Sequence, residues 1–542
     1  MHISYNKLTL FALGTGAKAG RDMAMKRTLF YRIYIFGLRF VQGITLFLMG
    51  ALTICSLFWG YYAEDMTTQA YVAHWEPFLI HLAGIAVLLL ALLLLQRFCH
   101  PSTRRRRTFL LTAAIGWICF CGLTLILFGG SIPHADAASV YSIAQALAHG
   151  HTEVIHPTDS YLSYYPQQIG LVAFYEILIR LWELLPISYA ALYMLQCVNV
   201  VMACIIVFFQ YKITELLFRG NDRAIVSYLF LAMLNAPLIV YTSFVYGEIP
   251  SFAFLSGGIY FVMRFFLEQG LSTRQRYLSL AYSVTLLVLG VAVRKNTLIV
   301  VIAVVLTTLW EWLREHKRGL ILYALLLTLL SLSILPAIQR IYEHRAGNVL
   351  SSGVPAISYL AMGMQESSRG YGWYNGFNFN TYADSNLDTA ITVQESKKAI
   401  AASLSAFRED PAYAFRFYTE KFLSQWTDGS YFCRQATLQH SDIRRERVTS
   451  LYTGSLAGPF IHYCNLYQLL VYAAALLCLL RIRRWKDMLP YVGMIAVLGG
   501  FLFHMIWEAN SRYILPYFLL LLPYAAQGLT GDYATSQSPV KN

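Results

Sequence analysis

The sequence predicts an all-α membrane protein: a polytopic bundle of 12–13 transmembrane helices with a large extracytoplasmic loop that contains further helices. Three observations indicate this class. First, 57% of the 542 residues are hydrophobic and only 13% are charged, whereas a soluble domain carries about 25% charged residues. Second, the apolar residues form long continuous runs. Third, the basic excess, 42 − 29 = +13, is concentrated in short segments between the runs. These features exclude a soluble enzyme, a disordered chain and a nucleic-acid-binding module, so no nucleic-acid partner is expected.

Each span needs about 20 mainly apolar residues, because the hydrocarbon layer is about 30 Å thick and a helix rises about 1.5 Å per residue. The runs do not alternate between apolar and polar residues, so we expect helices, which pair their own backbone groups. Twelve runs qualify or nearly qualify: 40–62, 78–96, 108–130, 190–211, 224–245, 249–267, 277–293, 297–313, 319–338, 463–481, 488–507 and 513–530. A thirteenth run, 166–187, has Glu176, Arg180 and Glu183 on one helical face. It is expected either to dip into the membrane or to span with that face against other helices.

The distribution of charge predicts the orientation. Lys and Arg cluster at 18–39, 97–107, 212–223, 264–276, 314–318 and 481–486, whereas the loop 63–77 is acidic. The positive-inside rule places the basic clusters in the cytoplasm. The chain then divides into a cytoplasmic segment 1–39, a transmembrane core 40–338 with a first outer loop 131–166, an extracytoplasmic loop domain 339–462, transmembrane helices 463–530 and a cytoplasmic tail 531–542. No Asn-x-Ser/Thr sequon is present, which fits a bacterial plasma membrane protein.

The first outer loop contains the main candidate residue, Asp136. This residue opens an amphipathic helix, roughly 137–148, whose apolar positions recur at helical spacing until Gly150. The helix is too short to span the membrane, so we expect it to lie along the surface. Two roles stay open for Asp136. It can cap the helix, which stabilises a helix by about 1 kcal/mol, or it can act as a catalytic carboxylate.

Other charged residues lie at span ends that are predicted to face outward. They are Glu248, Arg294 with Lys295, and Glu508 with Arg512. An ionisable group at membrane depth is costly and therefore indicates a functional site. Arginine binds phosphate bidentately, so the cations are predicted to contact a lipid phosphate. The alternatives are a helix-end salt bridge between Glu508 and Arg512, and interfacial anchoring for Arg294 and Lys295.

Two further residues complete the candidate site. Glu248 is predicted to orient an acceptor or to serve as a second acid, together with Glu508; its alternative role is a charge in the first turn of the helix before Pro250. His134, two residues before Asp136, is a candidate site member or a solvated loop histidine.

The predicted loop domain 339–462 is too long for a passive connector. Its segment 369–382 is rich in aromatic residues, Gly and Asn, which suits either sugar binding or a packed loop. A helix is expected over 392–425, interrupted near Asp410-Pro411, with Thr392 as a candidate cap and Glu395 completing a capping box. The apolar residues Phe407, Phe415, Phe422 and Trp426 are expected to pack against the membrane domain.

Several short segments, in this order, resemble the C-type (GT-C) membrane glycosyltransferases. They are Pro133-His134-Ala135-Asp136, the segment Tyr164-Tyr165-Pro166-Gln167-Gln168-Ile169-Gly170-Leu171, the segment Tyr246-Gly247-Glu248-Ile249-Pro250, and Trp507-Glu508-Ala509-Asn510-Ser511-Arg512-Tyr513-Ile514-Leu515-Pro516. The chain looks most like the group of protein O-mannosyltransferases and lipid A aminoarabinose transferases.

This resemblance implies an inverting hexosyl- or pentosyltransferase. It would move a sugar from a polyprenyl-phosphate carrier to a glycan, lipid or protein acceptor on the outer face, with Asp136 as general base. Many relatives have a second acidic residue directly after this Asp or close by, where Ala137 stands here. No metal ligand is therefore assigned, no nucleotide cofactor is expected, and a divalent metal is left open.

Three other functions stay open. A transporter or flippase of lipid-linked saccharide would place charges near the membrane midplane on interrupted helices. A polysaccharide polymerase or ligase would use paired Arg and His on the outer loop, for which Arg434, His440, Arg444 and Arg445 are candidates. A non-enzymatic assembly scaffold would tolerate substitution of Asp136.

Overall fold

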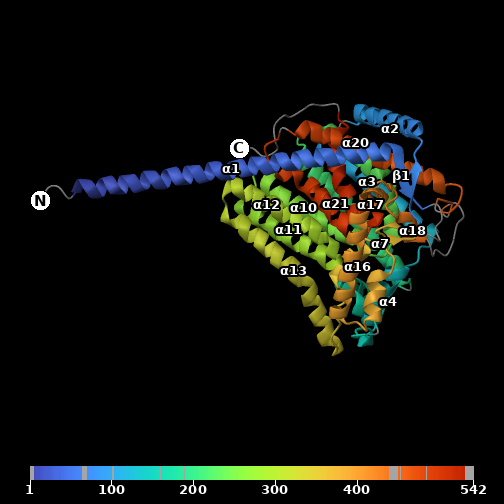
Figure 1. Cartoon of the computed structure of the whole chain (residues 1–542). Helices are drawn as coiled ribbons and strands as arrows, with labels where there is room; N and C mark the ends of the chain where they lie inside the picture. Colours follow the sequence, from blue (N-terminus) through green and yellow to red (C-terminus); the bar gives the residue numbers. More distant parts are fainter. Residues whose placement is uncertain are drawn as a thin grey trace.

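Most of the chain forms α-helices, many of them long. The computed structural model describes residues 5–63, 70–99, 103–158, 160–187, 189–438, 448, 450–451, 453–483 and 485–530, with side chains from 29 onward. The cytoplasmic tail predicted at 531–542 lies outside these residues. Figure 1 shows a bundle of helices, with α1 (Tyr5–Phe58) running along it and its first part extending beyond it. The predicted all-α class is confirmed.

Within the described residues, ten helices are long and apolar enough to cross a membrane. They are the part Leu29–Phe58 of α1, α2 (Phe78–Phe98), α3 (Arg104–Gly129), α7 (Ala191–Leu217), α10 (Glu248–Leu267), α11 (Thr273–Val293), η4 with α12 (Lys295–Thr297, Leu298–Glu315), α13 (Arg318–Ala346), α20 (Ala457–Ile482), and η5 with α21 (Leu489–Tyr491, Val492–Ile506). These helices make the chain a multi-pass membrane protein. Large apolar side chains on α2 are exposed, among them Leu79, Val87 and Phe98, as expected for a surface that faces lipid.

An eleventh span is formed if a bent pair of helices is taken together. α8 (Asp222–Leu234) and the segment Ala236–Ser243, which comprises α9 (Ala236–Val240) and η3 (Tyr241–Ser243), meet at 53°. The bend follows from Asn235, whose side chain caps the second helix by accepting a hydrogen bond from the Leu238 N–H, at 3.1 Å. Pro237 occupies the first turn, where its missing N–H costs nothing.

Three predicted runs differ in the structure. The first span ends at Phe58 rather than 62, because 59–62 form strand β1 (Trp59–Tyr62), which pairs antiparallel with β2 (Val72–Trp75). The last run, 513–530, contains α22 (Leu515–Gly528), whose 14 residues rise only about 21 Å. The thirteenth run contains α6 (Ile169–Glu183), with 15 residues, and it is not among the ten helices.

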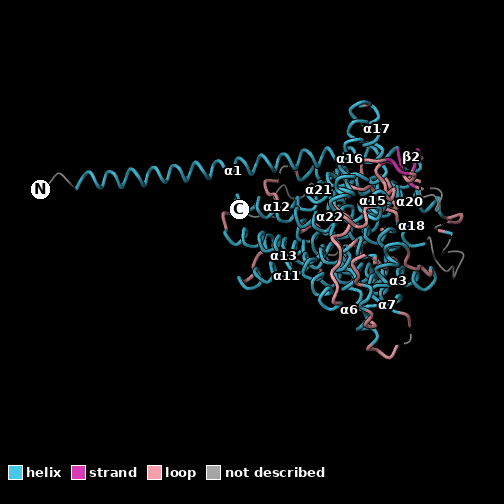
Figure 2. Tube along the Cα trace, turned by 60° about the horizontal axis from the view of Figure 1, so that its bottom comes forward, coloured by secondary structure: helices cyan, strands magenta, loops and turns pink. Residues whose placement is uncertain are grey.

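The loop domain predicted at 339–462 begins later, because α13 continues to Ala346, and α20 already begins at Ala457. Between them lie α14 (Ala356–Met362), the two-residue strands β3 (Glu366–Ser367) and β4 (Gly370–Tyr371), α15 (Phe377–Asp384), α16 (Thr389–Glu409), α17 (Pro411–Trp426) and α18 (Cys433–Leu438). In Figure 2, α17 lies near the strands of the hairpin, and its residues contact β1. The Tyr61 N–H of β1 donates to the Thr427 carbonyl, at 3.3 Å, which ties the hairpin to the end of α17.

The predicted interruption of the loop helix is found at Asp410, which accepts a hydrogen bond from the Tyr413 N–H at 3.0 Å and so begins α17. The predicted cap Thr392 is wrong. Asp388 caps α16 instead, accepting from the N–H groups of residues 390 and 391. An aspartate carboxylate at this position outcompetes a threonine one turn later, because it satisfies two otherwise unpaired N–H groups.

Two of the four apolar residues expected to contact the membrane helices do so. Phe422 and Trp426 pack on Phe501 of α21, with ring centroids at 5.3 and 6.3 Å. Phe415 is 75% exposed and does not, and Phe407 packs on other rings of the loop domain, including Phe417 at 5.1 Å. Phe407 therefore joins α16 to α17, and Phe415 lies on an exposed face of α17.

The predicted surface helix is α4 (Ala135–Ala148), which packs on α6. Its apolar face is buried as expected, with Val140, Ile143, Ala144 and Leu147 almost inaccessible to solvent. The charged face of α6 explains the thirteenth run. Glu176 receives hydrogen bonds from Arg180, at 2.8 Å, and from Arg345 of α13, and both arginines also donate to the Leu147 carbonyl at the end of α4. The ionic face therefore packs against two neighbouring helices.

Candidate active site

Asp136 lies in the first turn of α4 and not at its cap. The helix begins at Ala135, and His134 is the N-cap residue, without a side-chain hydrogen bond to the helix. The capping role considered for Asp136 is therefore wrong. Ala135 has φ +46°, a left-handed conformation that a non-glycine residue adopts at a cost. The strained residue immediately precedes the candidate base, and this turn directs the Asp136 carboxylate toward Tyr161.

Tyr161 is held in place by its own short helix, α5 (Tyr161–Tyr164). Ser160 caps this helix in a capping box with Ser163: the Ser160 hydroxyl accepts from the Leu162 N–H, and the Ser163 hydroxyl accepts from the Ser160 N–H. Burial raises the pKa of Asp136, while the charge of Arg512 and a hydrogen bond with Tyr161 lower it. Asp136 is thus a partly buried carboxylate with an elevated proton affinity.

Glu248 joins two arginines from distant parts of the chain. Its carboxylate is 2% exposed and sits in the first turn of α10. It forms ion pairs with Arg294, which follows α11, and with Arg512, whose Nε lies 3.3 Å from the Glu248 Oε1. The two guanidinium groups are 12% and 14% exposed. One carboxylate therefore fixes two cations side by side, and the group of three keeps a net positive charge.

Aromatic rings surround the two guanidinium groups. The Arg512 guanidinium lies 5.4 Å from the ring centroid of Tyr246 and 5.5 Å from that of Tyr513. Arg294 lies 6.0 and 5.7 Å from the same two rings. Gln168 donates to the Tyr246 hydroxyl at 2.6 Å, which holds that ring in place. Cation–π contacts of this kind favour the charged, desolvated guanidinium, so the two cations are held ready for an anion.

The Arg512 backbone is fixed from the loop domain. Arg512 lies in the 3₁₀ turn η6 (Ser511–Tyr513), whose start is capped by Asn510, at 2.9 Å from the Arg512 N–H. The Ser511 hydroxyl donates to Asp428 at 2.6 Å. Asp428 is fully buried and also accepts from the backbone N–H groups of Ser430 and Phe432. The loop after α17 therefore positions the arginine.

Glu508 adds a second acid beside Asp136. It is 8% exposed, and the Tyr513 hydroxyl lies 3.5 Å from its Oε1. The pKa of Glu508 is raised to about 7: burial and the negative charge of Asp136 raise it, while the charges of Arg512 and Arg369 lower it. A carboxyl group with this pKa exchanges a proton near neutral pH, as acid–base catalysts do.

Two residues of the loop domain, Arg369 and Tyr374, lie close enough to the site to interact with its charges. The Arg369 guanidinium lies 5.9 Å from the Tyr374 ring centroid. Burial raises the pKa of the Tyr374 hydroxyl, and the charges of Asp136 and Glu508 raise it further. Tyr374 is 37% exposed, whereas Trp373 and Tyr382 of the same segment are fully buried. The aromatic segment 369–382 is thus a packed loop that offers its Tyr374 side chain to the site.

Five of the seven predicted residues lie together; we call Asp136, Glu248, Arg294, Glu508 and Arg512 the Asp136 cluster. His134 is near its edge, with its ring centroid 6.4 Å from that of Phe244, a ring over which Arg512 also lies. Lys295 is exposed, and no ion pair involves it in the described part of the chain. The alternative salt bridge between Glu508 and Arg512 is replaced by the pair of Arg512 with Glu248.

Sequence reasoning missed the tyrosines Tyr161, Tyr246 and Tyr513. Each lies in or close to one of the segments that resemble the glycosyltransferases. Their place in the sequence beside these segments could have marked them as candidate site residues. Of the residues proposed for a polymerase or ligase, Arg434 is 3% exposed on α18, and His440, Arg444 and Arg445 lie outside the described residues.

The Asp136 cluster is not built as a metal centre. Among the residues that the structure describes, the grouping of His, Cys, Asp and Glu side chains with metal-binding geometry is Glu76, His81 and His462, and it includes none of the cluster's acids. Glu248 is occupied by its two arginines, and Ala137 offers no ligand beside Asp136. The side chains of the Asp136 cluster therefore do not fit a divalent metal ion.

No protein-family model and no curated protein matches the chain. Solved structures do. The oligosaccharyltransferase AglB from Archaeoglobus fulgidus, in complex with an inhibitory peptide and a dolichol-phosphate, is 13% identical over 77% of this chain and 50% of its own, with a TM-score of 0.42. AglB in complex with Zn and sulfate is 12% identical over 78% and 48%, with a TM-score of 0.42.

ArnT from Cupriavidus metallidurans, bound to undecaprenyl phosphate, is 12% identical over 72% of this chain and 77% of its own, with a TM-score of 0.28. AglB and ArnT are GT-C membrane glycosyltransferases, the class that the motifs of the sequence resemble. The chain spans about half the length of AglB.

Proposed function

We propose that the protein is a membrane glycosyltransferase. It moves a sugar from a polyprenyl-phosphate-linked donor to a cell-envelope acceptor, with Asp136 as general base. One observation carries the proposal: the Asp136 carboxylate, partly buried and with a raised pKa, lies within the electrostatic reach of Arg512, which Glu248 holds beside Arg294. A base for an acceptor hydroxyl and a cationic site for a leaving phosphate therefore lie in one place.

The reaction assigns a part to each side chain. Asp136 accepts the proton of the acceptor hydroxyl while that oxygen attacks the anomeric carbon of the donor. The bond from this carbon to the phosphate oxygen breaks, and its electron pair leaves with the lipid phosphate. Attack from the face opposite the phosphate inverts the anomeric centre. A positioned base of this kind accelerates transfer about 10²–10⁴-fold.

The leaving phosphate needs cations rather than an acid. Arg512 and Arg294 offer several N–H donors each, more than the Glu248 carboxylate accepts. Their permanent charge stabilises the phosphate as it gains negative charge. Lys295, next to Arg294, is proposed as an additional phosphate contact from the more exposed side.

The second acid, Glu508, is suited to the acceptor. With a pKa of about 7, it is partly protonated at neutral pH and can donate to or accept from a sugar hydroxyl. Glu248 is proposed to act indirectly, by positioning the arginines, and His134 to border the acceptor side. The proposed acceptor is a glycan, lipid or protein, and the transferred sugar is a hexose or pentose.

The location is part of the proposal. The basic segments predict that the Asp136 cluster faces outward across a bacterial plasma membrane. A polyprenyl phosphate would then enter from the outer leaflet, with its phosphate at the depth of Arg294 and Arg512. No soluble nucleotide is required, since the donor is carried by the lipid.

The test uses the purified full-length protein and a panel of undecaprenyl-phosphate-linked hexoses and pentoses labelled in the sugar. We expect at least one donor to lose its label to a cell-envelope fraction, and Asp136→Asn to slow this transfer about 10²–10⁴-fold. Asp384→Asn, which changes an exposed aspartate of α15, is the control and should leave transfer unchanged.

Two outcomes would contradict the proposal. If Asp136→Asn transfers sugar as fast as the wild type, Asp136 is not the base. If no donor is consumed while the protein moves the labelled lipid across a liposome membrane, the transporter or flippase alternative is correct.

A further inference from the structure

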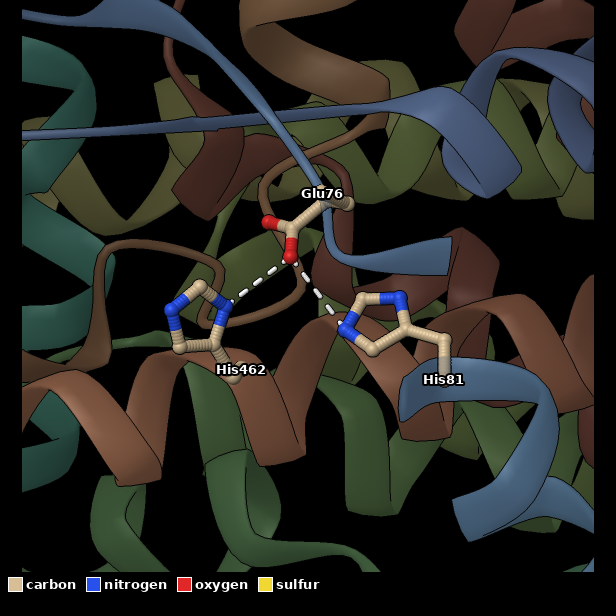
Figure 3. Close-up of side chains that lie close together, drawn as sticks. All are labelled: Glu76, His81 and His462. Atoms are coloured by element: carbon tan, nitrogen blue, oxygen red, sulfur yellow. Dashed lines mark hydrogen bonds and ion pairs between the residues drawn. The ribbon is translucent and has the colours of Figure 1, made fainter. Parts of the chain in front are cut away.

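A second group of ionisable residues lies outside the Asp136 cluster, where the hairpin, α2 and α20 meet. Glu76 follows β2, His81 lies in the first turn of α2, and His462 lies in the first turns of α20. Figure 3 shows both imidazole rings directed at one carboxylate. The Glu76 Oε2 lies 3.2 Å from the His81 Nε2 and 2.9 Å from the His462 Nδ1. We call these residues the Glu76 triad.

Both ring nitrogens of the buried His81 lack hydrogen-bond partners in the described part of the chain. The His81 side chain is 1% exposed. The Nε2 is at ion-pair distance from Glu76 without the alignment of a hydrogen bond. A buried imidazole with two unsatisfied nitrogens is costly. An ion bound at the Nε2 would satisfy that nitrogen.

The surroundings of Glu76 hold the carboxylate in the orientation that a ligand needs. Asn465 donates to its Oε1, which leaves the Oε2 directed between the two imidazoles. Gly60 of β1 provides the space, since a Cβ at that position would lie 2.1 Å from the Glu76 Oε1. A hydrogen bond from outside that orients a ligating carboxylate is a regular feature of metal sites.

The donor set indicates the ion. Two imidazoles and one carboxylate are typical ligands of Zn²⁺. For zinc bonds of about 2.0–2.2 Å, neighbouring ligand atoms in a tetrahedron lie about 3.4 Å apart. The two nitrogen–oxygen distances, 3.2 and 2.9 Å, are close to this value, and all three ligand atoms lie within 4.8 Å of one another. The His462 side chain is 42% exposed, so the triad can be reached from the surface of the protein.

We propose that Glu76, His81 and His462 bind one Zn²⁺, with a water molecule as the fourth ligand. Both histidines bind as neutral imidazoles and Glu76 as a carboxylate. The ion links three segments that are far apart in the sequence: the hairpin, the start of α2 and the start of α20. The proposal does not depend on the glycosyltransferase function, since no ligand belongs to the Asp136 cluster.

The triad is also connected to the loop that carries Arg512. Asn465, which bonds Glu76, accepts a hydrogen bond from the Gly429 N–H at 2.9 Å. The neighbouring Asp428 accepts from Ser511 at 2.6 Å, directly before Arg512. The zinc is therefore expected to act as a structural ion that stabilises this part of the chain.

The test measures zinc in the full-length protein, purified with a tag that contains no histidine. After removal of metal with a chelator and dialysis against ZnCl₂, elemental analysis should find one zinc per chain in the wild type. His462→Ala is the informative variant, because its exposed side chain can be removed with little effect on folding. His151→Ala is the matched control, since His151 is 63% exposed and pairs with Glu153.

We expect His462→Ala to bind zinc at least about tenfold more weakly, while His151→Ala binds like the wild type. Zinc should raise the melting temperature of the wild type and of His151→Ala, but not of His462→Ala. With Co²⁺ in place of Zn²⁺, the wild type should show the visible absorption of a tetrahedral site. Equal zinc binding by the two variants, or no stoichiometric zinc in the wild type, would overturn the proposal, and neither result depends on transferase activity.

Discussion

A buried glutamate lies near each end of α4, and the two glutamates differ in how well they are paired. At the C-terminal end, Glu176 is 3% exposed and receives hydrogen bonds from Arg180, Arg345 and the Tyr342 hydroxyl, at 2.6 Å for the tyrosine. At the N-terminal end, next to Asp136, Glu508 is 8% exposed and has the Tyr513 hydroxyl at 3.5 Å. One acid is fully paired, and the other is not.

The difference appears in their proton affinities. Burial raises the pKa of Glu176, but hydrogen bonds from Tyr342, Arg345 and Arg180 outweigh it and hold the pKa below its usual value. Burial also raises the pKa of Glu508, to about 7, because Arg512 and Arg369 compensate only in part and Asp136 adds a like charge.

This comparison separates acids that stabilise the fold from acids that are available for chemistry. A buried carboxylate that accepts several strong donors contributes to stability. One that lacks them is kept at a cost, and such residues gather at functional sites. The Glu176 contacts anchor α4 on α6 and α13, so the other end of the helix can hold Asp136 in its strained turn.

The largest effect on stability is expected for Glu176→Gln. Gln keeps the shape but removes the charge that two arginines share, so the free energy of unfolding should fall by roughly 1.5–3 kcal/mol. Chemical denaturation of the purified protein measures this. Glu395→Gln is the control: Glu395 is 45% exposed and pairs with Lys398, so a change below about 0.5 kcal/mol is expected. Equal effects of the two variants would show that the hydrogen bonds to Glu176 stabilise the fold no more than an exposed ion pair does.

The pH dependence of stability should have opposite signs at the two ends. Because the pKa of Glu508 is raised in the folded state, the folded protein binds more protons than the unfolded one between about pH 4.5 and 7, and Glu508 destabilises the fold as the pH rises through this range. Glu176, with a lowered pKa, gives stability that is lost as the pH falls toward its folded-state pKa.

Glu508→Gln should therefore raise the free energy of unfolding, and with it the melting temperature, at pH 8, where the wild-type carboxyl is ionised in both states, and should change them much less at pH 5. Thermal unfolding of both proteins across this range is the measurement. A variant that is less stable than the wild type at pH 8 would mean that Glu508 is ionised and well paired in the folded protein.

Much of the fold could be predicted from the sequence, because apolar length and helical spacing depend on local residues. The convergence of Glu248, Arg294 and Arg512 followed from their common position at span ends. The ion-pair partner of Arg512 could not be predicted in this way. Glu508 stands four residues before it, which suggests a helical pair, but 511–513 form a 3₁₀ turn in which that spacing no longer brings the two side chains together.

The Glu76 triad could not be predicted for another reason. Metal motifs are recognised by short spacings between ligands. Here Glu76 and His81 are close in sequence, but His462 comes from a helix near the other end of the chain. Only the packing of α20 against α2 brings the third ligand to the other two.

A smaller effect is expected for Arg512→Lys. The positive charge stays, but the fork of N–H donors and the flat surface between Tyr246 and Tyr513 are lost. The KM for a lipid-linked donor should rise about tenfold, equivalent to about 1.4 kcal/mol. Arg416→Lys is the control, since Arg416 is exposed and lies 5.7 Å from the ring of Tyr413, far from any proposed donor contact. An unchanged KM in Arg512→Lys would show that Arg512 only pairs with Glu248 and does not contact the donor phosphate.

The smallest effect concerns the strained residue beside Asp136. Ala135 has φ +46°, a conformation that costs a residue with a Cβ about 1–2 kcal/mol and glycine almost nothing. Ala135→Gly also makes the unfolded chain more flexible, which offsets about 0.4–1 kcal/mol of the gain, so the free energy of unfolding should rise by about 0–1.6 kcal/mol. Transfer should nevertheless slow, because a glycine no longer restricts the turn that directs the carboxylate. A variant with both faster transfer and lower stability would show that the strain at Ala135 does not serve to position Asp136.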